Sequence, residues 1–209
     1  MNVSDFGPIG LVVIQATSLC NLDCSYCYLP DRQKRHRFDL QQLPLLLQRI
    51  FESPYWGPHL SILWHAGEPL TLPPGYYDEA TDRLEQATVA LQQQGVVIEQ
   101  HVQTNATLIN QEWVDCFRRN RLVVGVSVDG PEWLHDAHRR FRNGRGSHAH
   151  TMRGIRLLQD QGVPFHAIAV LTEEALGQPE EMYAFLRDEG ILHIGFNVEE
   201  QEGVNASSS

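Results

Sequence analysis

Six short, largely apolar segments recur along the chain, and each is followed by a polar stretch. They occupy positions 11–14, 59–65, 96–102, 122–128, 163–171 and 191–198. The first is an unbroken apolar run, which suits a strand buried on both faces of a parallel sheet. The pattern therefore predicts six strands, with polar loops after their carboxyl ends.

Five segments with apolar residues at helical spacing separate the predicted strands. Asp39 and Asn110 are placed to cap two of these helices, and Pro44 is expected to kink or restart the first. Cys116 lies inside the third helix and is interpreted as a small buried hydrophobe. The segment 131–145, rich in His and Arg, is predicted to be a loop.

Alternating strands and helices predict an α/β fold. Strand–helix–strand units joined by right-handed crossovers build parallel sheets. Either a doubly wound sheet or a partial (β/α)6 barrel fits this order of elements. Because the chain turns polar after the sixth strand, a barrel would lack its last helix.

Four polar motifs stand directly after predicted strands, at positions 17–28, 66–69, 103–105 and 127–129. In both candidate architectures the carboxyl ends of the strands carry the chemistry. We therefore expect the four motifs to meet at one mouth of the sheet.

The length and charge of the chain limit its domain organisation and its partners. The 209-residue chain is long enough for one domain with a large core, and its net charge of -10 argues against nucleic acid as the main partner.

The sequence contains neither a signal peptide nor a membrane-spanning run, so a cytoplasmic, reducing location is predicted. Basic residues cluster at 32–37 and 139–145, where solvated loops are expected; the alternative is a docking rim for a carboxylate or an acidic peptide.

Three of the four cysteines form a Cys-x3-Cys-x2-Cys run after the first strand: Cys20, Cys24 and Cys27. Three thiolates suit an iron-sulfur cluster, and on a four-iron cube they leave one iron free to bind another ligand. A zinc site completed by a histidine such as His36, or a disulfide, would use the same residues. The missing second ligand pair argues against zinc, and a reducing cytosol argues against a disulfide.

Taken together, these motifs resemble those of the radical S-adenosylmethionine (SAM) superfamily. The resemblance spans roughly residues 9 to 205 and rests on Cys-x3-Cys-x2-Cys-Tyr-Leu-Pro, Trp-His-Ala-Gly-Glu-Pro-Leu, Gln-Thr-Asn-Ala-Thr-Leu, Val-Ser-Val-Asp-Gly-Pro, His-Asp-x-His-Arg and Gly-Phe-Asn-Val-Glu-Glu. Within the superfamily the chain is similar to the peptide-modifying enzymes that carry a SPASM region. It is most similar to the GrrM-type maturases of glycine-rich-repeat precursor peptides, and it shares motifs with the sulfatase-maturase branch.

The resemblance implies a role for each motif. It implies that Cys20, Cys24 and Cys27 bind a [4Fe-4S] cluster whose open iron is chelated by SAM. It further implies that SAM is contacted by Tyr26, Ala66, Gly67, Glu68, Ser127 and Arg139. Hydroxyl and guanidinium groups suit the ribose and carboxylate of such a ligand.

Two of the motif positions have a less direct interpretation. Ala66 stands where the family has glycine, and a positive φ would strain Ala by about 1 kcal/mol or more. A conformation that Ala tolerates is therefore expected at this position. Asp129 precedes Gly-Pro, where an Asp commonly caps a helix or turn; the alternative is a catalytic proton acceptor facing the substrate cavity.

The resemblance also implies a reaction. Reduced cluster would cleave SAM to methionine and a 5′-deoxyadenosyl radical, which would abstract hydrogen from a side chain of a precursor peptide and lead to a C–C crosslink, or cyclophane. A flavodoxin- or ferredoxin-type protein would donate the electron. The alternatives are oxidation of a Cys or Ser on a protein, as in sulfatase maturation, and a truncated module that binds a cluster or peptide without turnover.

One departure from the family concerns the C-terminal part. The related enzymes carry a cysteine-rich SPASM region with auxiliary clusters after the barrel, whereas no cysteine follows Cys116 here. We therefore expect residues 1–209 to form a single radical SAM core domain without that region. On this interpretation the chain is an N-terminal fragment of a longer enzyme or a truncated gene product.

Overall fold

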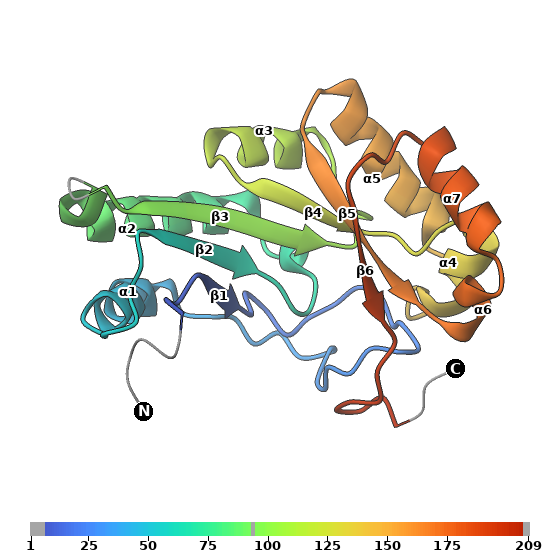
Figure 1. Cartoon of the computed structure of the whole chain (residues 1–209), viewed down its shortest axis with the longest axis horizontal. Helices are drawn as coiled ribbons and strands as arrows, with labels where there is room; N and C mark the ends of the chain where they lie inside the picture. The colour runs from blue at the N-terminus through green and yellow to red at the C-terminus, as the bar shows by residue number, and fades with distance from the viewer. Residues whose placement is uncertain (1–6, 93–94, 207–209) are drawn as a thin grey trace.

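The computed structural model describes residues 7–92 and 95–206 of the chain. Its six strands form one sheet in the order β1-β2-β3-β4-β5-β6, and every neighbouring pair is parallel. A doubly wound sheet reverses its strand order, whereas a barrel adds each strand beside the previous one. The sequential order confirms the partial barrel, and Figure 1 shows the sheet curled with helices around its outer side. The strands are β1 (Leu11–Ile14), β2 (His59–Trp64), β3 (Val97–Thr104), β4 (Val123–Ser127), β5 (Phe165–Leu171) and β6 (Ile194–Val198).

Helices fill the connections between the strands. The α-helices are α1 (Leu43–Phe51), α2 (Pro74–Gln92), α3 (Gln111–Arg119), α4 (Glu132–His138), α5 (His148–Asp160), α6 (Glu173–Leu176) and α7 (Pro179–Asp188), and short 3-10 turns occupy η2 (Leu40–Gln42) and η3 (Pro69–Thr71). None of the helices within the described ranges is long and apolar enough to cross a bilayer.

Several boundaries differ from the prediction. Segment 131–145 is not a plain loop, because Glu132–His138 forms α4 with Leu134 buried beneath it. A further short helix, α6, follows β5 and is capped by the Thr172 side chain. Pro44 does not kink α1 but lies in its first turn, where its missing N–H is harmless. Asp39 caps the preceding 3-10 turn, and Asn110 caps α3 as predicted.

The core lies between the sheet and its helices. Alternate strand residues such as Val102, Val124 and Val126 are fully buried on this side. Trp64 and Tyr77 pack edge to face with ring centroids 5.8 Å apart, and Cys116 is buried in α3 as expected. The intervening strand residues point to the concave side of the sheet, which leaves that side free to carry a site.

Helix α5 approaches the end of β3 very closely at Gly154. A Cβ atom added there would lie 2.3 Å from the Ala106 carbonyl oxygen, whereas one added at Gly75, in the first turn of α2, would meet nothing within 4 Å. Thr151 of α5 also donates a 3.0 Å hydrogen bond to the Asn105 carbonyl. The helix therefore presses directly on the loop that follows β3.

This contact predicts opposite effects for two glycine substitutions inside helices. Gly154→Ala should lower the free energy of unfolding by about 1 to 3 kcal/mol, because overpacking outweighs the gain in helix propensity. Gly75→Ala should raise it by up to about 1 kcal/mol. Urea denaturation of both variants measures this, and equal effects would contradict the close approach.

Candidate functional site

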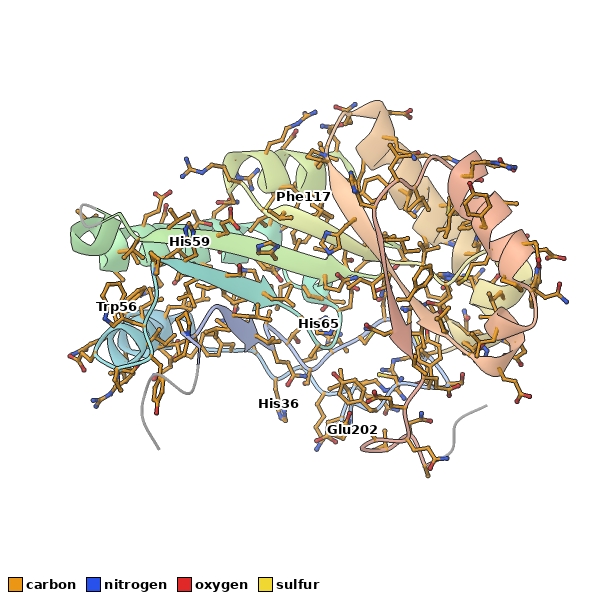
Figure 2. The ribbon with its side chains drawn as sticks, viewed as in Figure 1. His36, Trp56, His59, His65, Phe117 and Glu202 are labelled. Atoms are coloured by element: carbon orange, nitrogen blue, oxygen red, sulfur yellow. The ribbon has the colours of Figure 1, made fainter. Side chains whose placement is uncertain are left out.

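One cavity of about 620 Å³ lies at the carboxyl ends of the strands. It is lined by nearly all of the predicted site residues: Cys20, Cys24, Tyr26, Cys27, Ala66, Gly67, Glu68, Ser127 and Arg139. Asp129 is the predicted residue outside this lining. The structure thus brings the four strand-end motifs together at one mouth, as the sequence predicted. Figure 2 shows His65, which also lines the cavity, at the end of β2.

The loop that carries the cysteines is held by backbone hydrogen bonds on two sides. The Cys20 N–H donates to the Arg32 carbonyl at 2.9 Å, and the Asp23 N–H donates to the Arg140 carbonyl at 2.7 Å. Arg32 follows the cysteine loop directly, whereas Arg140 lies in the segment after α4. An irregular loop is thereby fixed without forming a helix or strand of its own.

Arginines from both basic clusters reinforce this loop. The Arg142 guanidinium donates to the Cys20 carbonyl at 3.1 Å, and Arg32 donates to the Cys24 carbonyl at 3.2 Å. Arg32 also pairs with Asp23 at 3.1 Å. Arg142 is exposed, as expected for a solvated loop, whereas Arg32 is half-buried. Both side chains also satisfy carbonyl groups that the irregular loop leaves unpaired, which the sequence did not predict.

The three loop cysteines are free thiols, so the disulfide alternative is not formed. Burial, helped by the nearby Glu68 charge, raises the pKa of Cys20 to about 12. Burial also raises the pKa of Cys24 to about 11, although Arg139 opposes the shift. Thiolates in this site need a strong positive partner, and a metal centre provides one by displacing the thiol protons. The donor set therefore fits a metal cluster.

The zinc alternative is not supported by the geometry. Within residues 7–92 and 95–206, no three His, Cys, Asp or Glu side chains are grouped so that they could hold one metal ion. This includes the proposed combination of Cys24, Cys27 and His36. A cubane does not require such convergence, because its cysteine ligands bind different irons.

A buried ion pair lies behind the cysteine loop. The Arg139 Nε donates to the Asp129 Oδ2 at 2.8 Å, and the Tyr26 hydroxyl donates to the same oxygen. The Val170 N–H of β5 donates to the other Asp129 oxygen at 3.0 Å. Burial alone would raise the pKa of Asp129, but the Arg139 charge and these hydrogen bonds outweigh it and hold the pKa below its usual value. The cap interpretation of Asp129 was wrong, because the N-cap residue of α4 is Pro131.

The 66–68 turn folds tightly against the start of the cysteine loop. Ala66 and Gly67 have φ values of 71° and 65°, so the expectation of a conformation that Ala tolerates easily was wrong. A Cβ at Gly67 would lie 2.3 Å from the Thr17 carbonyl oxygen. The Glu68 N–H donates to the Leu19 carbonyl at 2.8 Å. This close approach imposes the left-handed backbone despite the strain on Ala66.

The Glu68 carboxylate is fully buried but well bonded. It accepts hydrogen bonds from the Thr104 hydroxyl at 2.7 Å, the Asn105 N–H at 2.8 Å and the Leu70 N–H at 2.9 Å. Burial raises the pKa of Glu68, and these bonds oppose the rise. A carboxylate offers about four acceptor directions, so the three hydrogen bonds use most of the capacity of Glu68, which also lines the cavity.

Sequence reasoning did not identify several residues that build this site. Asn105 donates to the Asn21 side chain at 2.9 Å, which ties the end of β3 to the cysteine loop. Gln103 donates to the Ser127 hydroxyl at 2.9 Å. Both residues belong to the predicted 103–105 motif, with Gln103 inside β3 and Asn105 directly after it. Their residue types alone did not reveal their partners.

The tail after β6 also reaches the cysteine loop. The Val204 N–H donates to the Tyr28 carbonyl at 3.1 Å. Residues Glu199, Glu200 and Glu202 line the cavity near this contact, and Figure 2 marks Glu202 in the tail. The tail therefore adds an acidic rim that its polar sequence did not predict.

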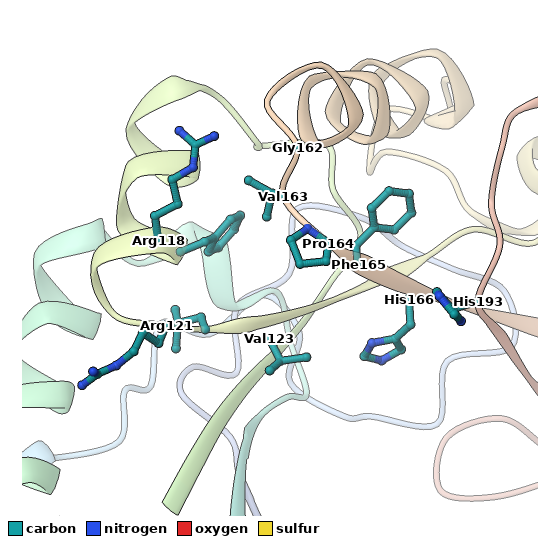
Figure 3. Close-up of a pocket in the computed structure, with 11 residues that line it drawn as sticks. Arg118, Arg121, Val123, Gly162, Val163, Pro164, Phe165, His166 and His193 are labelled. Carbon is teal, nitrogen blue, oxygen red and sulfur yellow. The ribbon is translucent and has the colours of Figure 1, made fainter.

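A second cavity of about 460 Å³ lies on the amino-terminal side of β4 and β5 (Figure 3). Its lining includes Phe117, Arg118, Val123, Phe165 and His166. None of the predicted site residues lies there. Because the functional edge of parallel strands is the carboxyl one, we assign the site to the first cavity.

Comparison with known proteins agrees with this assignment. The profile of the radical SAM superfamily matches residues 14–198, and the chain belongs to this superfamily, whose members bind a [4Fe-4S] cluster and SAM. An uncharacterized protein of Synechocystis sp. is 46% identical over the whole chain and 52% of its own length. A serine-type anaerobic sulfatase-maturating enzyme of Bacteroides thetaiotaomicron is 31% identical over 90% of this chain and 46% of its own length. The chain thus spans about half the length of these relatives.

Solved structures show the same fold. The structure described as anSMEcpe with bound AdoMet superposes with a TM-score of 0.81 at 23% identity, over 92% of this chain and 52% of that one. Streptococcus suis SuiB bound to its precursor peptide SuiA gives a TM-score of 0.67 at 19% identity, over 94% of this chain and 40% of that one.

The buried ion pair leads to a stability prediction. Asp129→Asn should lower the free energy of unfolding by about 3 to 5 kcal/mol, because it leaves the buried Arg139 charge without its partner. The control is Glu85→Gln, which breaks the exposed pair with Arg121 and should cost about 1 kcal/mol or less. Denaturation at neutral pH measures both, and similar losses would contradict a dominant role for the buried pair.

Proposed function

We propose that this chain is the SAM-cleaving core of a radical enzyme, with Cys20, Cys24 and Cys27 as ligands of a [4Fe-4S] cluster. The observation that carries the proposal is the single cavity shared by these thiols and the residues proposed to contact SAM: Tyr26, Ala66, Gly67, Glu68, Ser127 and Arg139. When bound and reduced, such a cluster supplies the electron that cleaves SAM to methionine and a 5′-deoxyadenosyl radical. The chain itself orients the ligand and limits its contact with water.

The polar residues of the cavity suit different parts of SAM. Glu68 and the carbonyl groups of the 66–68 turn are acceptors for its amino group, whereas Arg139 and Ser127 offer donors for carboxylate or ribose oxygens. We propose that Asp129 acts by orienting Arg139 and Tyr26. A proton acceptor facing the substrate is less consistent with its burial, its lowered pKa and its ion pair.

We propose a side chain of a ribosomally made peptide or protein as the substrate. The names of the similar proteins support this class, since they act on sulfatases or bind a precursor peptide. The concave side of the sheet offers exposed apolar positions such as Val13, which pairs in register with the cavity-lining Leu63. An extended peptide could lie along this side or add to a free strand edge.

The finer proposal is a C–C crosslink in a glycine-rich precursor peptide, giving a cyclophane. One hydrogen of the substrate is transferred to the 5′-deoxyadenosyl carbon, and closure of the new bond releases a proton and an electron. An oxidised iron-sulfur centre would accept that electron. We place this chemistry in the cytoplasm, where thiols stay reduced, with a flavodoxin- or ferredoxin-type protein as electron donor.

A second candidate is oxidation of a protein Ser or Cys. The 31% identity with a serine-type sulfatase-maturating enzyme favours it. Removal of two hydrogens from a serine CH2–OH group produces an aldehyde rather than a crosslink, so the two candidates differ in a chemically detectable product.

The cluster assignment is tested by comparing two cysteine substitutions. After anaerobic reconstitution and reduction with SAM present, the wild-type chain and Cys116→Ala should form 5′-deoxyadenosine, since Cys116 lies in α3, outside the cavity lining. Cys24→Ala should lose this activity by at least about a hundredfold. Chromatography of the nucleoside products measures it. Failure of cluster-loaded wild type to form 5′-deoxyadenosine would favour a binding module without turnover.

The substrate proposal is tested with two peptides, one glycine-rich with aromatic residues and one with a sulfatase-type serine. We expect the glycine-rich peptide to lose two hydrogens, to resist fragmentation between two residues and not to react with an aldehyde probe. Tandem mass spectrometry measures this. An aldehyde on the serine peptide would favour the second candidate. Formation of 5′-deoxyadenosine with both peptides unchanged would contradict the substrate class but not SAM cleavage.

A further inference from the structure

His138, at the end of α4, bonds through both ring nitrogens to residues of two other segments. Its Nδ1 lies 2.9 Å from the Ser25 hydroxyl, and its Nε2 lies 2.8 Å from the Glu174 carboxylate. Its ring is largely buried, with 10% of the side chain exposed. A half-exposed carboxylate and an exposed serine are thereby joined through one nearly buried imidazole.

The hydrogen-bond directions follow from the donor and acceptor chemistry. A carboxylate only accepts, so the proton of a neutral His138 lies on Nε2 and points to Glu174. Nδ1 is then the acceptor, and the Ser25 hydroxyl donates to it. Ser25 is held twice by His138, because its backbone N–H also donates to the His138 carbonyl at 3.0 Å.

Ser25 and Glu174, the two residues that His138 joins, both lie next to elements of the proposed site. Ser25 stands between Cys24 and Cys27, within the part of the loop that carries two of the three cluster ligands. Glu174 follows β5 in the first turn of α6 and also accepts from the Thr172 hydroxyl at 3.2 Å. Val170, near the end of the same strand, lines the cavity.

The hydrogen bonds of His138 act on a different part of the cysteine loop from the other contacts that hold it. Arg142 and the Arg32 carbonyl fix the Cys20 end, where the loop leaves β1. His138 instead anchors the Cys24–Cys27 segment to the opposite side of the mouth, where β5 ends. Without it, that segment would keep its backbone bond to α4 and its link through Tyr26 and Asp129 to Val170 of β5. It would lose its connection to the β5–α6 turn.

We propose that His138 is a positioning residue that fixes the Cys24–Cys27 segment against the β5–α6 turn through Ser25 and Glu174. This proposal rests on the proposed function, since it concerns how the cluster ligands are oriented. Any displacement of the turn after β5 would be transmitted to two cluster ligands through one rigid ring. Three side chains outside the recognised ligand set would thus contribute to the geometry of the cluster site, beside the arginine and backbone contacts that hold the rest of the loop.

Two near-isosteric substitutions separate the two halves of the link. His138→Asn places an amide near the Nδ1 position and keeps the contact with Ser25, whereas His138→Gln places it near the Nε2 position and keeps the contact with Glu174. Each should speed hydrogen exchange at the Ser25 amide of the metal-free protein by up to about tenfold. The matched control is Glu189→Gln, which breaks the Arg156–Glu189 pair between α5 and the end of α7 and should leave that amide unchanged.

A double-mutant cycle tests the connection itself. Ser25→Ala and Glu174→Gln should act non-additively on exchange of the Cys24 and Cys27 amides, and additively once His138 is replaced by Ala. Exchange in β3 should stay unchanged throughout. Unchanged exchange at Ser25, or an equal rise in β3 and the loop, would overturn the proposal.

A spectroscopic measurement extends the test to the loaded protein. In wild type, SAM should change the electron paramagnetic resonance signal of the reduced cluster. In both His138 variants the iron content should persist, but this change should become smaller and broader. An identical signal in the variants would overturn the proposal, whereas failure of wild type to take up a cluster would refute the proposed function and leave the exchange test of His138 standing.

Discussion

The buried ion pair between Asp129 and Arg139 is the interaction on which the site depends most. Its carboxylate receives donors from the end of α4, from the cysteine loop and from β5. Each donor satisfies a charge that would be costly to bury alone, and removal of one partner leaves the other uncompensated. Tyr26 extends the pair toward the cavity, where the Arg139 guanidinium carbon lies 5.5 Å from its ring centroid. A single buried charge thus aligns three separate segments.

The second constraint is the tight fit between the 66–68 turn and the start of the cysteine loop. The turn approaches the Thr17 carbonyl oxygen so closely that Gly67 has no room for a side chain, and this close approach imposes the left-handed backbone that strains Ala66. Glu68 then reaches the end of β3, and Asn105 continues the connection to Asn21 of the loop. The loop therefore depends on hydrogen bonds from strand ends rather than on secondary structure of its own. This explains how an irregular segment can hold three thiols in fixed positions.

The superfamily assignment and the geometry support different parts of the functional conclusion. The profile match establishes the radical SAM family, and the cavity shows which side chains of this chain face one another. The two proposed reactions, peptide crosslinking and serine oxidation, differ in their products, and the choice between them remains part of the proposal. The His138 link adds a proposal about the chain itself, because it couples the end of β5 to the cysteine loop.

The sequence by itself determined the six parallel strands, the partial barrel as one of two architectures, and the gathering of four motifs at one mouth. Local periodicity and the common direction of parallel strands are enough for this, since neither requires knowledge of distant contacts. Only the tertiary structure decided that Ala66 is left-handed, that Asp129 pairs with Arg139, that α4 forms within the predicted loop, and that His138 connects Ser25 to Glu174. The Ala66 conformation and the His138 link arise from segments that are far apart in sequence, and Asp129 also binds the distant Tyr26 and Val170. Packing rather than a local pattern therefore fixes these partners.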